Sequence, residues 1–203
     1  IGYSKACNIG ASHATGKYLI FSNSDISITS SFGTELVETC KRISKDTIWG
    51  FKQLEPSVLY TEVSRLFPLN LLELFVQKVF GLRELQVAEN SKKVPWIQSS
   101  FMITQRIWFE RLHGFDERYF VFMADVDICL RTWIKNGFVM YGNGITLYSD
   151  GIRATSNKVL KKGFLDSVQK IHLSDAVSFF KLNSKNGMRI ARKINKLYKE
   201  NVL

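Results

Sequence analysis

The chain has few acidic residues, few cysteines and no apolar run long enough to span a bilayer. Asp and Glu total 18 against 28 Lys and Arg, so the formal net charge at pH 7 is +10. Such a balance favours anionic partners, namely nucleic acid, phosphorylated substrates or an acidic membrane surface. The excess of positive charge is concentrated in the last third of the sequence.

The cysteines are odd in number and have no metal-ligand spacing: Cys7, Cys40 and Cys129. This pattern argues against a disulfide framework and a zinc site, and it predicts reduced thiols in a cytosolic setting. The longest apolar stretch, residues 66–80, is interrupted by Pro68 and several polar residues. It therefore does not predict a membrane-spanning helix.

A length of 203 residues suits one domain, or one domain with a small appendage. Hydrophobic residues make up 45% and aromatic residues 13%, which is enough for a substantial core and excludes a disordered chain. The sequence contains no internal repeat and no low-complexity segment.

Apolar periodicity in the first quarter predicts helices that alternate with short strands. The expected elements are a helix over 6–15 closed by Gly16, a strand over 17–22, a helix from Thr29 or Ser30 to 43, and a strand over 47–51. This alternation favours an α/β layer with a parallel sheet.

The remaining chain continues with longer elements. We expect a helix over 57–85 broken near Pro68, a strand over 95–104, a helix over 105–113 closed by Gly114, a helix over 125–135 ending at Asn136-Gly137, strands over 138–141 and 145–148, and a basic amphipathic tail from 160.

Residues 114–131 place four acids among aromatic side chains. Burying a carboxylate is costly unless it is paired, binds a cation or takes a proton, so this segment is a candidate site of chemistry. The alternative is structural. Residues 116–118 would form a solvated turn, and Asp125 would cap the helix that follows it.

A second candidate is Asn23-Ser24-Asp25, directly after a short apolar strand. Open α/β sheets bind ligands at the carboxyl ends of their strands. An Asp there can hold a divalent cation that bridges two phosphates, because Mg²⁺ often shares only one or two carboxylates with a nucleotide. The alternative is an Asx turn at the end of the strand.

Residues 1–25 resemble the family-2 inverting glycosyltransferases of the GT-A fold. The shared features are Asn-x-Gly at Asn8 and Gly10, Ala-x-Gly at residues 14–16, an apolar strand, and an Asp-x-Asp-like signature with Asn23 first and Asp25 second.

A second block resembles the rhamnosyltransferase-like branch of that family. It comprises residues 95–103, then Gly-Phe-Asp-Glu at 114–117 with an aromatic pair, then Asp125-Val126-Asp127-Ile128-Cys129-Leu130-Arg131. Together the two blocks cover most of residues 1–150.

The resemblance implies an α/β GT-A fold with a mostly parallel central sheet flanked by helices. Family members open with strands that contact the nucleobase, so a chain starting at Ile1 is expected to lack its first strands. The expected domains are a GT-A-like domain over 1–157, incomplete at its N-terminus, and a basic amphipathic helical extension over 158–203.

The resemblance also assigns roles on the donor side. Asp25 would coordinate Mg²⁺ or Mn²⁺ on the diphosphate of a UDP- or dTDP-sugar. Asn8, Gly10 and Asn23 would contact the same donor.

On the acceptor side, Asp125 would be the general base that deprotonates the acceptor hydroxyl, and the sugar would transfer with inversion. Trp96, Asp116 and Asp127 would bind the acceptor. A core position for Trp96 and an (i, i+4) pair between Asp127 and Arg131 are the structural alternatives.

Three departures from the family pattern affect the expected activity. Ala124 stands where the family usually has Glu, Ser99 stands where it has Gly, and residues 147–151 lack the His that often helps to hold the metal. Two functions therefore remain open. One is an active transferase in bacterial surface polysaccharide synthesis, and the other is an impaired domain that binds a sugar nucleotide or a partner without turnover.

The partners expected are a nucleotide sugar and a glycan or lipid-linked acceptor. Nucleic acid is not expected, because the basic residues form no motif for base stacking or groove reading. The basic tail fits either contact with an anionic membrane or packing on the domain. The location expected is cytoplasmic, at the inner face of the cell membrane.

Overall fold

The computed structural model describes residues 1–54, 66–74, 92–149, 167–183 and 185–203. Most of the helix expected over 57–85 lies outside the described residues, as do the first residues of the basic tail and residues 150–151. None of the helices in the described parts is long and apolar enough to cross a bilayer.

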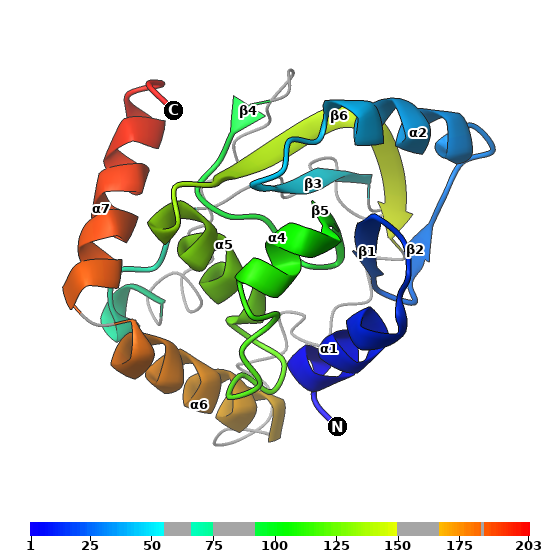
Figure 1. The fold of residues 1–203 in the computed structure, drawn as a ribbon. Coiled ribbons are helices and arrows are strands. Elements are labelled where there is room, and N and C mark those ends of the chain that lie inside the picture. Colours follow the sequence, from blue (N-terminus) through cyan, green and yellow to red (C-terminus); the bar gives the residue numbers. More distant parts are fainter. Residues whose placement is uncertain (55–65, 75–91, 150–166, 184) are drawn as a thin grey trace.

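The central element is one mixed sheet (Figure 1). Its order is β1-β5-β3-β6-β2, and β4 pairs with β6 outside this path. The strands are β1 (Tyr18–Ser22), β2 (Ile26–Ser27), β3 (Thr47–Leu54), β4 (Lys92–Lys93), β5 (Phe101–Gln105) and β6 (Phe138–Ser149).

The expectation of a mostly parallel sheet is wrong for the described strands, because only β3 and β6 pair in parallel. β5 lies between β1 and β3 and runs antiparallel to both, and β2 and β4 run antiparallel to β6. β1, β3 and β6 nevertheless point in the same direction. Their carboxyl ends therefore meet at one edge of the sheet, which is where such sheets bind ligands.

The two strands expected over 138–141 and 145–148 form one strand, β6. Phe51 pairs with Gly142 but Lys52 pairs with Thr146, so the register skips residues 143–145. A Cβ at Gly142 would lie 2.8 Å from the Phe51 ring, which explains a glycine at this irregularity.

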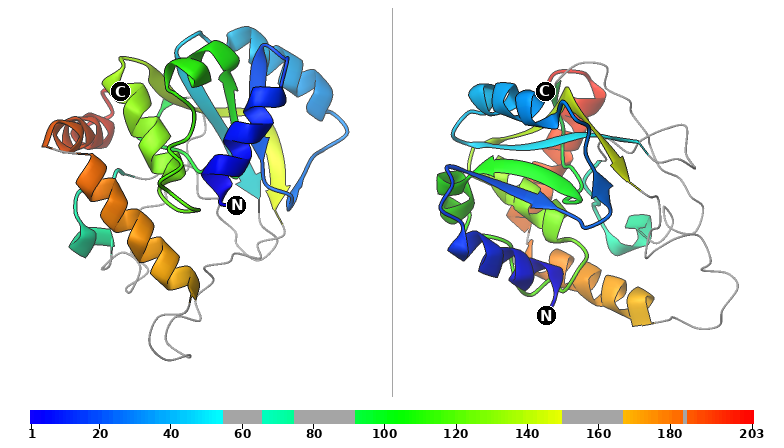
Figure 2. Two further views of the ribbon diagram at one scale, coloured as in Figure 1. Left: turned by 60° about the horizontal axis from the view of Figure 1, so that its bottom comes forward. Right: turned by 90° about the vertical axis from the view of Figure 1, so that its right-hand side faces the viewer.

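Helices cover both faces of the sheet (Figure 2). α2 (Phe32–Arg42) packs on one face, while α1 (Tyr3–His13), α4 (Arg106–Arg111) and α5 (Ala124–Ile134) lie on the other. Successive residues of β5 point to opposite faces of the sheet. Met102 packs in the apolar cluster under α1, α4 and α5, whereas Phe101 and Ile103 pack in the cluster under α2. The α/β class expected from the sequence is confirmed.

Some element boundaries differ from the sequence expectation. α1 ends at His13 with Ala14 in an extended conformation, so Gly16 is not a left-handed cap. β5 begins at Phe101, and residues 95–100 before it are not a continuous strand. α4 ends at Arg111 rather than 113, and the turn that closes it has two left-handed residues, His113 with φ 61° and the expected Gly114 with φ 67°.

Two further helices, α6 (Ser167–Leu182) and α7 (Lys185–Lys199), pack against α5 (Figure 1). Their buried apolar residues join the same core cluster as those of α5: Ala176, Phe179, Met188, Ala191, Ile194 and Tyr198. The apolar face of α7 is thus covered by the protein itself.

Candidate active site

Asp25 lies at the carboxyl edge shared by β1, β3 and β6. It is half-buried in the turn between β1 and β2, and it accepts a hydrogen bond of 3.3 Å at Oδ2 from the hydroxyl of Ser149. The pairing of Ile26 with Ser149 brings the end of β6 to this turn. The resemblance leads one to expect a metal-binding His within residues 147–151. Ser149 lies in that stretch, and its hydrogen bond shows that a side chain at position 149 reaches Asp25.

Asn23 is held at the same edge by its backbone. Its N–H donates to the carbonyl of Ser100 at 2.8 Å, and its carbonyl accepts from the N–H of Ile26 at 3.4 Å. The Asn23 side chain itself is exposed. The polar turn expected after β1 is therefore present, and it is tied to the segment before β5.

Asp125 lies in the first turn of α5 and is half-buried. Its Oδ1 accepts the N–H of Val126 at 2.9 Å, and its Oδ2 accepts the N–H of Ser99 at 3.4 Å. The carboxylate is thus directed toward the segment before β5 rather than away from the sheet.

Ser99 and Ser100 lie between Asp125 and the turn that carries Asp25. The sequence had suggested these two acids from separate motifs. Ser99 bonds to Asp125, while the carbonyl of Ser100 accepts from Asn23 beside Asp25. The hydroxyl of Ser100 also donates to Oε1 of Gln53 near the end of β3, at 2.9 Å. Sequence reasoning missed Gln53, although a polar residue near the end of an apolar strand was a usable signal.

Tyr3 is a second residue that sequence reasoning missed. Its hydroxyl donates to the carbonyl of Ser99 at 3.0 Å. Burial strongly raises the pKa of the Tyr3 hydroxyl, and the nearby Cys7 and Asp125 add to the increase. Tyr3 therefore stays protonated and acts as a donor that fixes the segment in contact with Asp125.

Comparison with known proteins relates the chain to glycosyltransferases. No protein-family model matches it. Rhamnosyltransferase WbbL of Escherichia coli (strain K12) is 29% identical over 124 residues, which are 58% of this chain and 46% of that protein. N-acetylglucosaminyl-diphospho-decaprenol L-rhamnosyltransferase of Mycobacterium tuberculosis (strain H37Rv) is 37% identical over 46 residues, or 23% of this chain and 15% of the relative.

A crystal structure of GalNAc-T7 with UDP, GalNAc and Mn²⁺ matches with a TM-score of 0.54 over 73% of this chain and 30% of that one. Its sequence identity of 11% means that it shows the fold alone. The chain is rhamnosyltransferase-like in sequence and has the GT-A fold. It spans less than half the length of the curated relatives that it matches.

In this GT-A fold, two of the expected donor residues lie away from Asp25. The amide of Asn8 bonds to the backbone of Phe115 in both directions, at 2.8 and 2.9 Å, and also donates to Glu117. Gly10 is exposed further along α1, toward the start of β1, and a Cβ at this position would have no neighbouring heavy atom within 4 Å.

Asp116, expected near the acceptor, is paired with a neighbouring cation. Its carboxylate accepts from Nε of Arg118 at 2.8 Å, and this hydrogen bond lowers the pKa of Asp116 below its usual value. Asp116 lines a cavity of about 450 Å³ together with Asn8, Glu117 and Arg131.

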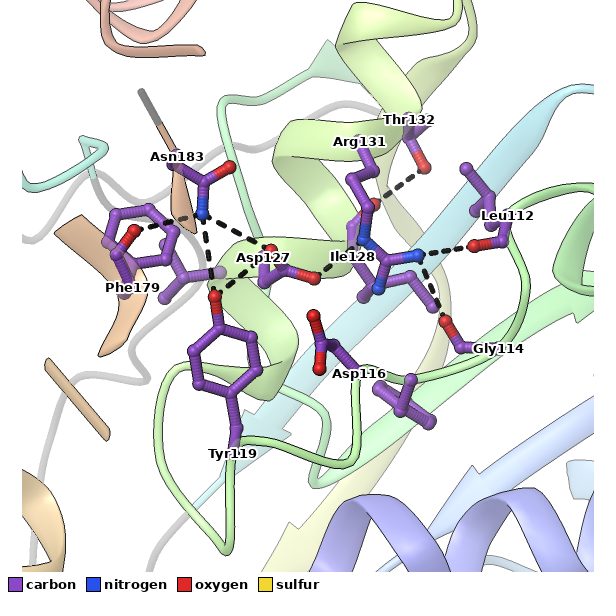
Figure 3. Close-up of polar contacts among 12 residues, drawn as sticks. Leu112, Gly114, Asp116, Tyr119, Asp127, Ile128, Arg131, Thr132, Phe179 and Asn183 are labelled. Atoms are coloured by element: carbon purple, nitrogen blue, oxygen red, sulfur yellow. Dashed lines mark hydrogen bonds and ion pairs between the residues drawn. The ribbon is translucent and has the colours of Figure 1, made fainter. Parts of the chain in front are cut away.

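Asp127 is only 3% exposed, and its side chain lies among those of Arg131, Tyr119 and Asn183 (Figure 3). Its carboxylate binds Nε of Arg131 at 2.6 Å, and it accepts from the Tyr119 hydroxyl and the Asn183 amide, each at 3.3 Å. The (i, i+4) pair considered from the sequence is present, so the structural alternative describes Asp127 better than acceptor binding.

Trp96 lies in the core and is 8% exposed. Its indole N–H donates to the carbonyl of Leu66 at 3.0 Å. The core position considered from the sequence is therefore the one observed.

The residues around Asp25 can supply part of a metal site. Within the described ranges, no three His, Cys, Asp or Glu residues are grouped so as to hold an ion. Asp25 and Ser149 nevertheless offer carboxylate and hydroxyl oxygens. This small set fits a hard cation that takes its other ligands from a diphosphate and water.

Proposed function

We propose that this chain carries out glycosyl transfer from a nucleotide-diphosphate donor to a hydroxyl of a glycan or lipid-linked acceptor, with inversion. The pathway would be bacterial surface polysaccharide synthesis, which the similarity to rhamnosyltransferases supports. One observation carries the proposal. At the carboxyl edge of the sheet, Asp125 accepts a hydrogen bond from Ser99, and the turn that carries Asp25 is bonded through Asn23 to the adjacent Ser100.

Asp125 would act on the acceptor. Its carboxylate accepts the proton of the acceptor hydroxyl as that oxygen bonds to the anomeric carbon of the donor sugar. The bond between that carbon and the diphosphate oxygen breaks in the same step, and the electron pair leaves with the nucleoside diphosphate. A single displacement of this kind inverts the anomeric centre.

Asp25 and Ser149 would act on the UDP- or dTDP-linked donor. With Asn23 exposed beside them, they would hold Mg²⁺ or Mn²⁺ against the diphosphate. The cation would offset the negative charge that develops on the leaving nucleotide.

A second function rests on Ala124. This residue is 1% exposed, so its methyl group packs in the core beside Asp125 and supplies no second acid. A domain of this kind would bind a sugar nucleotide, or a partner, without turnover. The buried position of Ala124 is the observation that favours this alternative.

The basic C-terminal extension over 158–203 would contact an anionic membrane at the inner, cytoplasmic face. Six exposed cations occupy α7: Lys185, Arg189, Arg192, Lys193, Lys196 and Lys199. With about 3.6 residues per turn, four of them lie on the side away from its buried residues, and Arg192 and Lys199 lie at the flank. Because the apolar face of α7 is already covered, the contact would be electrostatic.

Transfer assays test the function directly. The complete chain would be given dTDP-rhamnose or UDP-sugars with an N-acetylglucosaminyl-diphosphoprenol acceptor, alongside Asp125→Asn. We expect transfer by the unchanged chain and a loss of at least about 100-fold in the variant, with donor binding retained. Donor binding without transfer in the unchanged chain would favour the second function, and full turnover by Asp125→Asn would reject Asp125 as the base.

A further inference from the structure

Asp175 of α6 binds three consecutive backbone amides of a distant segment. Its carboxylate accepts the N–H groups of Phe120, Val121 and Phe122 at 3.1, 3.0 and 2.8 Å. Asp175 is only 3% exposed. A carboxylate this buried requires hydrogen-bond partners, and bonds to a charged acceptor are stronger than neutral ones. The path of residues 120–122 is thus fixed by α6.

This segment leads directly into the helix that carries Asp125. Met123 precedes α5 in the left-handed conformation, with φ 64°, and makes no side-chain cap hydrogen bond. A non-glycine residue in this region is strained and persists only where its surroundings determine the backbone. The position of Asp125 therefore depends on how residues 120–122 are held.

The other side of the segment is held by α1. The N–H of Tyr3 donates to the carbonyl of Phe120 at 2.6 Å, and a Cβ at Gly2 would lie 2.4 Å from the same oxygen. Figure 1 shows the connection between α4 and α5 lying between α1 and α6. Tyr3 thus binds a backbone carbonyl of residues 120–122, and Asp175 binds the backbone N–H groups of the same residues.

A second contact from the C-terminal helices reaches α5 itself. The amide of Asn183 donates to Oδ1 of Asp127 at 3.3 Å and to the carbonyl of Phe179 at 3.2 Å (Figure 3). Asp175 holds the chain before Asp125, and Asn183 holds the chain after it. Both residues lie in the segment that the sequence indicated as an appendage.

We propose that Asp175 is a positioning residue that sets the location of Asp125 for transfer. This inference rests on the proposed function, in which Asp125 is the base. Asp175 touches no reacting atom and acts through the backbone of residues 120–122. A displacement of a reacting group by about 1 Å can reduce turnover about 100-fold, so loss of these three bonds is expected to appear in kcat.

The test compares Asp175→Asn and Asp175→Ala in the complete chain, with dTDP-rhamnose and the diphosphoprenol acceptor. Asn keeps the shape and one acceptor oxygen, whereas Ala removes both acceptors. We expect kcat to fall about 10-fold for Asn and about 100-fold for Ala, with the donor KM within about twofold. Asn195→Ala is the matched control, since Asn195 is also buried and bonds both backbone groups of Phe67, away from this loop.

Asn195→Ala should lower the melting temperature but leave kcat unchanged for the folded fraction. Unchanged kcat in folded Asp175→Ala would overturn the proposal while leaving the proposed function intact. Hydrogen exchange gives a readout independent of transfer. The amides of 120–122 should exchange at least about 10-fold faster in Asp175→Asn than in Asn195→Ala, and equal exchange would also overturn the proposal.

Discussion

Asp25 and Ser149, separated by 124 positions in the sequence, are joined by a hydrogen bond of 3.3 Å. The pairing of β2 with β6 creates this contact. A side chain at position 149 therefore meets the carboxylate that we propose as a metal ligand. The identity of residue 149 is expected to set how strongly a cation is held.

We expect Ser149→His to tighten the metal-dependent part of nucleotide binding about 10-fold, because imidazole is the commonest metal ligand in proteins. Calorimetric titration of dTDP with Mn²⁺, and again with EDTA, measures the difference. Ser27→His, on exposed β2, is the control and should bind as the unchanged chain does. Asp25→Asn should remove the metal dependence, and a Mn²⁺ effect that survives in this variant would refute the role of Asp25.

A second prediction concerns the buried pair of Asp127 and Arg131. The Asp127 side chain is 4% exposed and that of Arg131 is 23% exposed. Arg131→Met leaves a buried carboxylate without its cation, and we expect it to lower the free energy of unfolding by about 3 kcal/mol. Urea denaturation measures this change. The double variant Asp127→Asn/Arg131→Met should recover part of the loss, and a double variant less stable than the single one would contradict this explanation.

The candidate site could be predicted from the sequence only in part. Asp25 and Asp125 stand in recognisable motifs, and the spacing of Asp127 and Arg131 already suggested their pairing. The direction of β5 was not visible, because all five of its residues are buried between helices on both faces of the sheet. The strand therefore lacks the alternation of apolar and polar residues by which a half-exposed antiparallel strand is recognised. Asp175 carries no local signal either. Its role arises from three amides more than 50 residues earlier, which only the tertiary fold brings together.

A third prediction follows from the lowered pKa of Asp116. The hydrogen bond from Arg118 lowers this pKa below the ordinary 3.8 in the folded chain. The pair therefore stabilises the fold above about pH 4, and its contribution is lost as the pH falls through the lowered folded-state pKa. Because 62% of the Arg118 side chain is exposed, Arg118→Gln should cost less than about 1 kcal/mol at pH 7.

Urea denaturation from pH 7 down to pH 3 measures that difference. The stability gap between Arg118→Gln and the unchanged chain should narrow as the medium becomes more acidic. Asp116→Asn/Arg118→Gln should show no such narrowing relative to Asp116→Asn. A gap that widens in acid would show that the pair does not account for this pH dependence.

The last prediction concerns the six cations of α7. Each Lys or Arg near an anionic bilayer contributes about 1 kcal/mol, so Lys185→Gln/Arg189→Gln/Arg192→Gln should weaken vesicle binding about 100-fold. Sedimentation with vesicles that contain the anionic lipid phosphatidylglycerol measures this. Lys41→Gln/Arg42→Gln/Lys45→Gln removes the same charge from exposed positions in and after α2, and it should bind as the unchanged chain does.

Binding to neutral vesicles, or equal loss in both triple variants, would reject α7 as the contact. Binding to an RNA or DNA duplex at physiological salt, with none to vesicles, would replace the membrane by nucleic acid as the partner.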